Sequence, residues 1–286
     1  MNAGFACGKR ERKMSLKKNL AMVLVAALLA ACGGGGGDST PAPAPAPAPS
    51  NFSCFGPGMT DIVDGLRLIS VNTTGIQPHN CRLAGVFEGA PVPTGKWAVK
   101  ISLKPGDCGA NSGYDDCKND RARFELSEDP QASTHGQKLV REFKLYLPKQ
   151  ERLRPKGDNI MFLSQLNFGD SKSFGTLAFL EVGADGDLYV RTQKGFTWEV
   201  QQIYPAYKNP YDKWIGVRYE IDSTTADTGS FKVYVDGKLI VDQVRPTLPS
   251  KEGLNYLRVG IYNAFLSQAT EPYVEQVIYY DQIKGK

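Results

Sequence analysis

Three short segments of the chain carry side chains that can bind an anion or transfer a proton. They span residues 121–126, 164–168 and 256–262, and in each one polar or aromatic side chains alternate with apolar ones. Such alternation is typical of a β-strand with one face in a core. Guanidinium and amide groups donate hydrogen bonds, and a phenol can donate or accept a proton. Joined outer faces would make a groove for a long polar ligand, although ordinary solvated strands show the same residue types.

The alternation places one set of polar and aromatic side chains on the face away from the core. The set is Arg121, Arg123, Glu125, Gln165, Asn167, Tyr256, Arg258 and Tyr262. A fourth segment, residues 188–191, adds Tyr189 and Arg191 to one face. The pattern supports a binding groove but does not by itself identify a reaction.

The elements that must position these residues are short strands. From about residue 95 onward, period-two runs are separated by Gly, Pro, Asp and Asn, and Asp236-Gly237 is a strong hairpin signal. After residue 31, no stretch keeps the spacing of apolar residues that a long amphipathic helix would show. We therefore expect an all-β sandwich or jelly roll of two antiparallel sheets, with one concave outer face.

The N-terminal residues have the sequence pattern of a secretory leader. Basic residues up to Lys18 precede an apolar run, Leu20 to Ala31, which is too short to span a bilayer. The run ends in Leu29-Ala30-Ala31-Cys32, which resembles a bacterial lipoprotein cleavage box. We expect residues 1–31 to be a lipoprotein signal peptide, with translation starting at Met1 or Met14.

The predicted mature chain begins at a lipidated Cys32. Glycines and a Pro-Ala tract make residues 32–50 a tether, and residues 51–286 remain for one β-domain. We expect a bacterial lipoprotein at the outer membrane or cell surface, with the lipid anchor as its only contact with the membrane.

The net charge of +4 belongs to the leader, which holds six basic residues and one acidic residue. Removing these from the totals of 34 basic and 30 acidic residues leaves 28 and 29. A nucleic-acid-binding protein needs surplus cations to neutralise phosphates. The remainder has none, so nucleic acid is excluded as the partner.

Four cysteines follow the predicted lipidation site, an even number that favours two disulfides in an oxidising compartment. Proximity in sequence favours Cys54–Cys81 and Cys108–Cys117 among three possible connectivities. Zinc is a weaker interpretation, because no Cys-x-x-Cys spacing occurs and the chain has only two histidines. We expect structural disulfides, no metal site and no cofactor.

In order and spacing, the three segments resemble the signature blocks of jelly-roll polysaccharide lyases (alginate lyases, glucuronan lyases and heparin-lyase-I-like proteins). Arg123-Phe124-Glu125-Leu126 is similar to the family's Arg-(Ser/Thr)-Glu-Leu block, and Gln165-Leu166-Asn167 stands where the family has Gln-(Ile/Val)-His. Residues 256–263 resemble its Tyr-Phe-Lys-Ala-Gly-(Ile/Val)-Tyr-Asn block. The likeness covers about residues 85–286, with Asn167 in place of the histidine and Arg258 in place of the lysine.

The resemblance implies β-elimination in a uronic-acid polysaccharide of alginate or glucuronan type. A base removes the C5 proton, and the 4-linked oxygen leaves an unsaturated sugar. Gln165, Asn167 and Arg123 would neutralise the sugar carboxylate, and asparagine cannot replace histidine as a base. Tyr262 would be the acid/base, its pKa depressed by Arg123, and His135, in a turn after the first block, is the alternative base.

The resemblance also suggests residues that bind the acidic polysaccharide along the groove. They are Glu125, Arg258, Tyr256, Tyr189 and Arg191.

We expect the protein to be a monomer. Two other functions remain open: a non-catalytic carbohydrate-binding jelly-roll module, and a glycoside hydrolase of similar fold. A hydrolase needs two facing carboxylates, and the sequence offers Glu125 without an evident second one.

Overall fold

A computed structural model describes residues 62–71, 84–88, 91, 95, 97–109, 115–130, 132–149, 160–193, 195–196, 201–268 and 274–285. The chain divides into two units, Met1–Ala46 and Pro47–Lys286, and all described residues belong to the second. The predicted leader, Cys32, the tether, Cys54 and Cys81 lie outside the described residues. Among the described residues, no helix has both the length and the apolar composition needed to cross a membrane.

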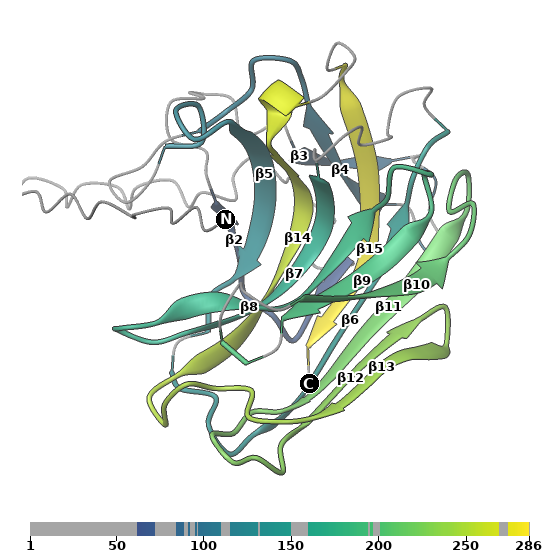
Figure 1. Ribbon diagram of the computed structural model, residues 1–286. Coiled ribbons are helices and arrows are strands. Elements are labelled where there is room, and N and C mark those ends of the chain that lie inside the picture. The colour runs from purple at the N-terminus through teal and green to yellow at the C-terminus, as the bar shows by residue number, and fades with distance from the viewer. Residues whose placement is uncertain are drawn as a thin grey trace, which may run out of the picture. The chain divides into compact units, whose positions relative to one another are not determined.

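The described residues form two sheets (Figure 1). Sheet A has the order β13-β12-β11-β6-β15-β4-β3, and β1 pairs with β15 in parallel. Its strands are β1 (Val63–Asp64), β3 (Ala84–Glu88), β4 (Trp97–Leu103), β6 (Lys138–Tyr146), β11 (Trp214–Asp222), β12 (Ser230–Val235), β13 (Lys238–Val244) and β15 (Gln276–Gly285). The predicted turn at Asp236-Gly237 joins β12 to β13.

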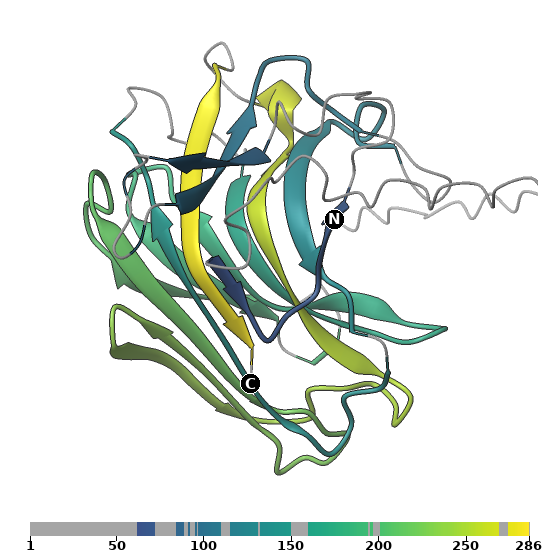
Figure 2. The same ribbon diagram turned by 180° about the vertical axis from the view of Figure 1, so that it is seen from behind.

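Sheet B has the order β10-β9-β8-β7-β14-β5-β2, and each neighbouring pair is antiparallel. Its strands are β2 (Leu68–Val71), β5 (Arg121–Glu128), β7 (Ile160–Gly169), β8 (Phe174–Val182), β9 (Leu188–Gln193), β10 (Gln201–Tyr207) and β14 (Leu254–Ala264). A short 3₁₀ helix, η1 (Leu266–Gln268), follows β14. Figure 2 shows the two sheets from behind, with the long yellow β15 of sheet A toward the viewer.

The main core lies between the sheets and consists of the apolar side chains that alternation assigned to the inner faces. On β5 these are Ala122, Phe124 and Leu126, and on β14 they are Leu257, Val259 and Ile261. Tyr280 of β15 ties the layers together, because its buried hydroxyl donates to the carbonyl oxygen of Leu163 at 2.6 Å. The predicted all-β sandwich of two sheets is therefore confirmed.

Candidate functional site

Strand pairing brings the three predicted segments together on the outer face of sheet B. Tyr262 of β14 pairs with Arg123 of β5, and on the other side of β14 Arg258 pairs with Gln165 of β7. Tyr256 pairs with Asn167. Figure 1 shows β5, β14 and β7 as neighbouring strands. Three segments that are distant in sequence thus form one surface, which we call the sheet-B face.

Tyr262 lies on the sheet-B face and not in the core between the sheets. It is 8% exposed and packs in a small separate cluster with Phe162, Phe179 and Ala264. The ring centroids of Phe162 and Tyr262 are 5.4 Å apart. Apolar side chains therefore pack around the Tyr262 ring on the same face of the sheet as Gln165 and Asn167.

Arg123 covers the ring of Tyr262 and is itself fixed by a buried carboxylate. Its guanidinium carbon lies 3.9 Å from the ring centroid of Tyr262. Its Nε and Nη2 donate to Asp116 Oδ2 and Oδ1, both at 2.7 Å, and its Nη1 lies 3.9 Å from Glu125 Oε2. A bidentate pair of this kind fixes both the position and the plane of a guanidinium.

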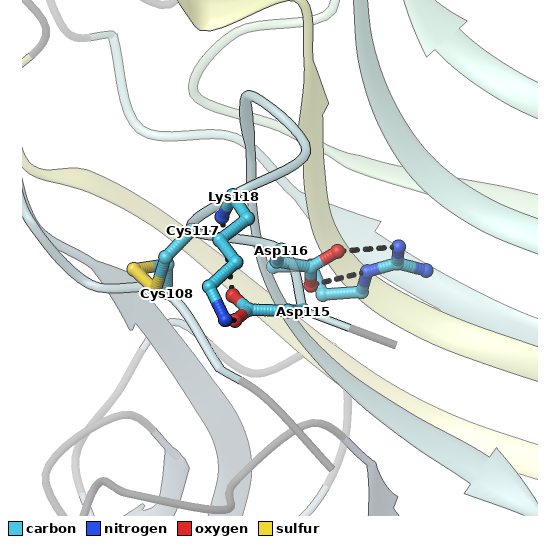
Figure 3. The surroundings of a disulfide bond; sticks show 6 residues. Cys108, Asp115, Asp116, Cys117 and Lys118 are labelled. Atoms are coloured by element: carbon cyan, nitrogen blue, oxygen red, sulfur yellow. Dashed lines mark hydrogen bonds and ion pairs between the residues drawn. A yellow bond between two sulfur atoms is a disulfide. The ribbon is translucent and has the colours of Figure 1, made fainter. Parts of the chain in front are cut away.

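Asp116 is a site residue that the sequence analysis missed. It is fully buried and adjoins Cys117, whose disulfide to Cys108 spans 5.3 Å between Cα atoms. Figure 3 shows the disulfide, the neighbouring Asp115–Lys118 ion pair and the Asp116 carboxylate reaching away from both. The predicted Cys108–Cys117 disulfide is confirmed. The available sequence signal for Asp116 was the Cys108–Cys117 disulfide, because the loop that this disulfide closes ends a few residues before Arg123 and so had to lie beside the first segment.

The pKa of Tyr262 moves in the direction opposite to the predicted one. Burial raises it by more than Arg123 and Arg121 lower it, and the carboxylates of Glu125 and Asp116 raise it further. The prediction failed because it considered the nearby cation without burial, which has the largest effect on this pKa, and without the carboxylates of Glu125 and Asp116 that add to it. In the free protein Tyr262 is therefore a neutral phenol at neutral pH.

Glu125 occupies the centre of the sheet-B face and is 1% exposed. It accepts a short hydrogen bond from Nε2 of Gln165. Burial raises the pKa of Glu125, against the lowering effects of Arg123, Arg258 and the Gln165 hydrogen bond. The Gln165 amide is thus engaged with a protein carboxylate when no ligand is bound.

The raised pKa of Glu125 predicts that this side chain destabilises the fold at neutral pH. A carboxyl whose pKa is higher in the folded than in the unfolded protein binds its proton more tightly when folded. The free energy of unfolding therefore falls as pH rises from the ordinary pKa of the carboxyl to its raised, folded-state pKa. We expect Glu125→Gln to remove that fall and to raise Tm near pH 7 by about 2–4 °C. Thermal unfolding between pH 4 and 8 measures it.

The matched control is Glu252→Gln, which changes an exposed carboxyl in a turn and should leave Tm unchanged. A lower Tm for Glu125→Gln at every pH would show that the contacts to Arg123 and Gln165 outweigh the cost of burial.

Asn167 presents an unsatisfied hydrogen-bond donor. Its side chain is fully buried, and its Oδ1 accepts from Thr176 Oγ1 at 2.6 Å. Its Nδ2 has no hydrogen-bond partner among the described residues. A buried donor without a partner costs about 1–3 kcal/mol, and a ligand oxygen would recover that cost.

Arg258 is a half-buried cation of the predicted set, and its charge helps to lower the pKa of Glu125. It lies between Phe174 and Tyr256, with its guanidinium carbon 5.5 Å and 5.3 Å from their ring centroids. Within the described part of the chain it forms no ion pair, and its Nε has no hydrogen-bond partner. A half-buried guanidinium held between two rings can receive a carboxylate from outside.

Tyr189 and Arg191 lie on the sheet-B face but are engaged by protein groups. Arg191 donates to both carboxylate oxygens of Glu181, at 2.6 and 2.9 Å. Tyr189 donates to Asp185 at 2.5 Å, which raises its pKa to about 12. Their predicted contact with a ligand would require exchange of these partners.

His135 is not brought to Tyr262. Its neighbour Thr134 donates its backbone N–H to the carbonyl oxygen of Gly253 at 3.2 Å, just before β14 begins. Tyr262 lies nine residues further along this strand, roughly 30 Å at the rise of extended chain. The turn after the first segment therefore leads away from the phenol.

Comparison with known proteins gives a family match and a similar fold. A family model described as polysaccharide lyase matches residues 86–284. Among solved structures, an endo-β-1,4-glucuronan lyase from the fungus Trichoderma reesei is 17% identical with a TM-score of 0.52, over 71% of this chain and 86% of that one. In sequence, no curated protein shows significant similarity.

Two more solved structures match with lower TM-scores. A marine alginate lyase from Zobellia galactanivorans is 13% identical with a TM-score of 0.47, over 70% of this chain and 85% of that one. A β-glucanase catalytic domain from Podospora anserina is 18% identical with a TM-score of 0.42, over 66% and 72%. The glucuronan lyase likeness confirms the predicted jelly-roll fold.

Proposed function

The chain belongs to the polysaccharide lyase family, and from that premise we propose that it cleaves a uronic-acid polysaccharide by β-elimination on the sheet-B face. The substrate class we infer is alginate or glucuronan. The observation that carries the proposal is the register of β5, β14 and β7, which places Arg123, Gln165, Asn167, Arg258 and Tyr262 on one surface.

We assign recognition of sugar carboxylates to the donors that the protein leaves unsatisfied. Among the described residues Arg258 has no ion-pair partner, and Asn167 offers a buried Nδ2. Removal of the proton next to a carboxylate places extra negative charge on that group, so donors must already face it. Gln165 can join them by exchanging its hydrogen bond with Glu125 for one to the substrate.

We assign the proton transfer to Tyr262. As phenolate it would take the C5 proton, the C4–O bond would break, and the resulting phenol would return the proton to the leaving oxygen. The stacked guanidinium of Arg123 at 3.9 Å stabilises the phenolate relative to an uncovered ring. No metal or cofactor enters the proposal.

The raised pKa of Tyr262 makes the pH dependence of this reaction predictable. Only a small fraction is phenolate at neutral pH, and that fraction grows about tenfold per pH unit below the pKa. We expect log kcat/KM to rise with a slope of about 1 from pH 7 to 9, measured as initial rates on a soluble polymer. A flat or falling profile would remove Tyr262 as the base.

Two other functions fit the same fold and are separated by one assay. Incubation with alginate, glucuronan, hyaluronan and heparin should give ultraviolet absorbance from the unsaturated product on at least one. Binding without absorbance would indicate a carbohydrate-binding module, which the Asn167 substitution makes the second candidate. New reducing ends without absorbance would indicate a hydrolase.

We further propose that the enzyme is held at the outer membrane or cell surface through a lipid on Cys32, with residues 32–50 as the tether. The support is the sequence alone, a small-residue box before the cysteine. In a bacterial host we expect Cys32→Ser to move the protein from the membrane fraction to the soluble fraction. Retention of the variant in the membrane fraction would contradict lipidation.

A further inference from the structure

The outer face of sheet A carries a row of three aromatic side chains. Tyr146 of β6 pairs with Trp214 of β11 on one side and with Tyr279 of β15 on the other. The ring centroids are 5.5 Å apart for Tyr146 and Trp214 and 6.2 Å apart for Tyr146 and Tyr279. Core residues flank Tyr146 and Tyr279 in sequence, and the core residue Ile215 follows Trp214, so the rings point away from the core.

These rings are half-buried and mutually supported. Their planes meet at 49° and 76°, so they form a stepped surface. Burial, and after it the nearby carboxylate of Asp212, raise the pKa of the central Tyr146, which therefore stays a neutral phenol. Large rings that keep part of their area in solvent are more typical of a binding surface than of a plain sheet face.

A hollow of about 420 Å³ adjoins the aromatic row on the same face. Its lining includes Lys144 of β6, Gly216 of β11 and Lys284 of β15. Gly216 follows Trp214 by two residues on β11 and pairs with Lys144, and a Cβ atom there would meet nothing within 4 Å. The glycine therefore leaves open the space between the row and the rest of the hollow.

The charges in the hollow favour an anionic ligand. Arg218 is neutralised by Glu142, at 3.5 Å, and by Glu220. Lys144 and Lys284 form no ion pair among the described residues, but both lie close enough to the buried carboxylate of Asp281 to lower its pKa against the raising effect of burial. Both lysines are partly exposed beside the aromatic row, so they can offer charge to a ligand in addition to their effect on Asp281.

We propose that Trp214, Tyr146, Tyr279, Lys144 and Lys284, here called the sheet-A platform, form a second binding site for a uronate polysaccharide. Pyranose C–H groups would pack on the electron-rich ring faces, and the lysines would pair with sugar carboxylates. The platform lies on the opposite side of the sandwich from the sheet-B face, so a short oligosaccharide cannot occupy both. It would hold a polymer chain and raise its local concentration near the enzyme.

The proposal rests on the family assignment, which supplies the polysaccharide, and not on catalysis. Binding is measured by affinity electrophoresis in gels containing alginate, glucuronan or a neutral β-glucan. Tyr262→Phe serves as the background, so that the polymer stays intact. The variants are Trp214→Ala with Tyr279→Ala, and Lys144→Gln with Lys284→Gln, and circular dichroism checks their fold.

We expect each pair of substitutions to weaken binding to the preferred acidic polymer about fivefold or more, the lysine pair more at low salt than at high salt. Lys251→Gln, an exposed lysine in a turn, should change nothing. With Tyr262 restored, turnover of short oligosaccharides should stay at the parent level.

Unchanged acidic-polymer binding in the lysine variant overturns the proposal, and its circular dichroism shows whether the fold has stayed intact after the two charges near the buried Asp281 are removed. Equal binding of the neutral glucan and the acidic polymers by the parent also overturns it. Absence of unsaturated product from any polymer would refute the proposed function alone, because platform binding is measured without turnover.

Discussion

Replacement of Tyr262 by Phe is expected to lower kcat for unsaturated product by about 10²–10⁴-fold, the usual contribution of a positioned proton-transfer group. Phenylalanine keeps the ring that packs on Phe162 and under Arg123, so folding and polymer binding should persist. The variant loses only the hydroxyl, and among the described residues around the ring no other side chain is placed to take over its proton transfer. Absorbance of the unsaturated product at saturating substrate gives kcat, and gel retardation gives binding.

Tyr256→Phe is the matched control, because this phenol lies on the same strand and its pKa is also raised by burial. Its hydroxyl lies near Nη2 of Arg258 at 3.4 Å, so we expect a small change in KM and little change in kcat. If Tyr262→Phe retained turnover, or if both variants lost it equally, the proton-transfer role of Tyr262 would be refuted.

Replacement of Asp116 by Asn is expected to have the second largest effect, through Arg123. The substitution leaves a buried guanidinium without its ion-pair partner, a change that typically costs about 3–5 kcal/mol of stability. Free movement of Arg123 over the Tyr262 ring should also lower kcat by about 10–100-fold, since misplacement by 1 Å can cost that much. Thermal unfolding and initial rates measure the two effects.

The pH profile separates positioning from a purely structural role. The charge of Asp116 helps to raise the pKa of Tyr262, so its removal should lower that pKa and shift the alkaline rise of kcat/KM to lower pH. Asp115→Asn is the control, because Asp115 pairs with the exposed Lys118 at 3.1 Å and not with Arg123 (Figure 3). A destabilised Asp116 variant with an unshifted profile would show that Asp116 only stabilises the fold.

Local sequence determined which side chains leave the core. In a strand the side-chain period is two, so Arg123 and Glu125 had to leave the core once Phe124 was inside, and Tyr262 had to leave it once Ile261 was inside. Composition and alternation were therefore sufficient for the all-β sandwich, and proximity in sequence was sufficient for the Cys108–Cys117 disulfide. These features depend on neighbours a few residues apart, which a sequence displays directly.

Strand order and register were decided only by the tertiary structure. They place β14 between β5 and β7, put Asp116 under Arg123 and leave His135 at the other end of β14. The pKa of Tyr262 followed from the same long-range packing, because burial and a counterion outweighed the cation visible in sequence. The aromatic row on sheet A has the same origin: Trp214, Tyr146 and Tyr279 meet only because β11, β6 and β15 pair in one register. Contacts between distant segments depend on loop closure and on the packing of the whole sandwich, which no local pattern encodes.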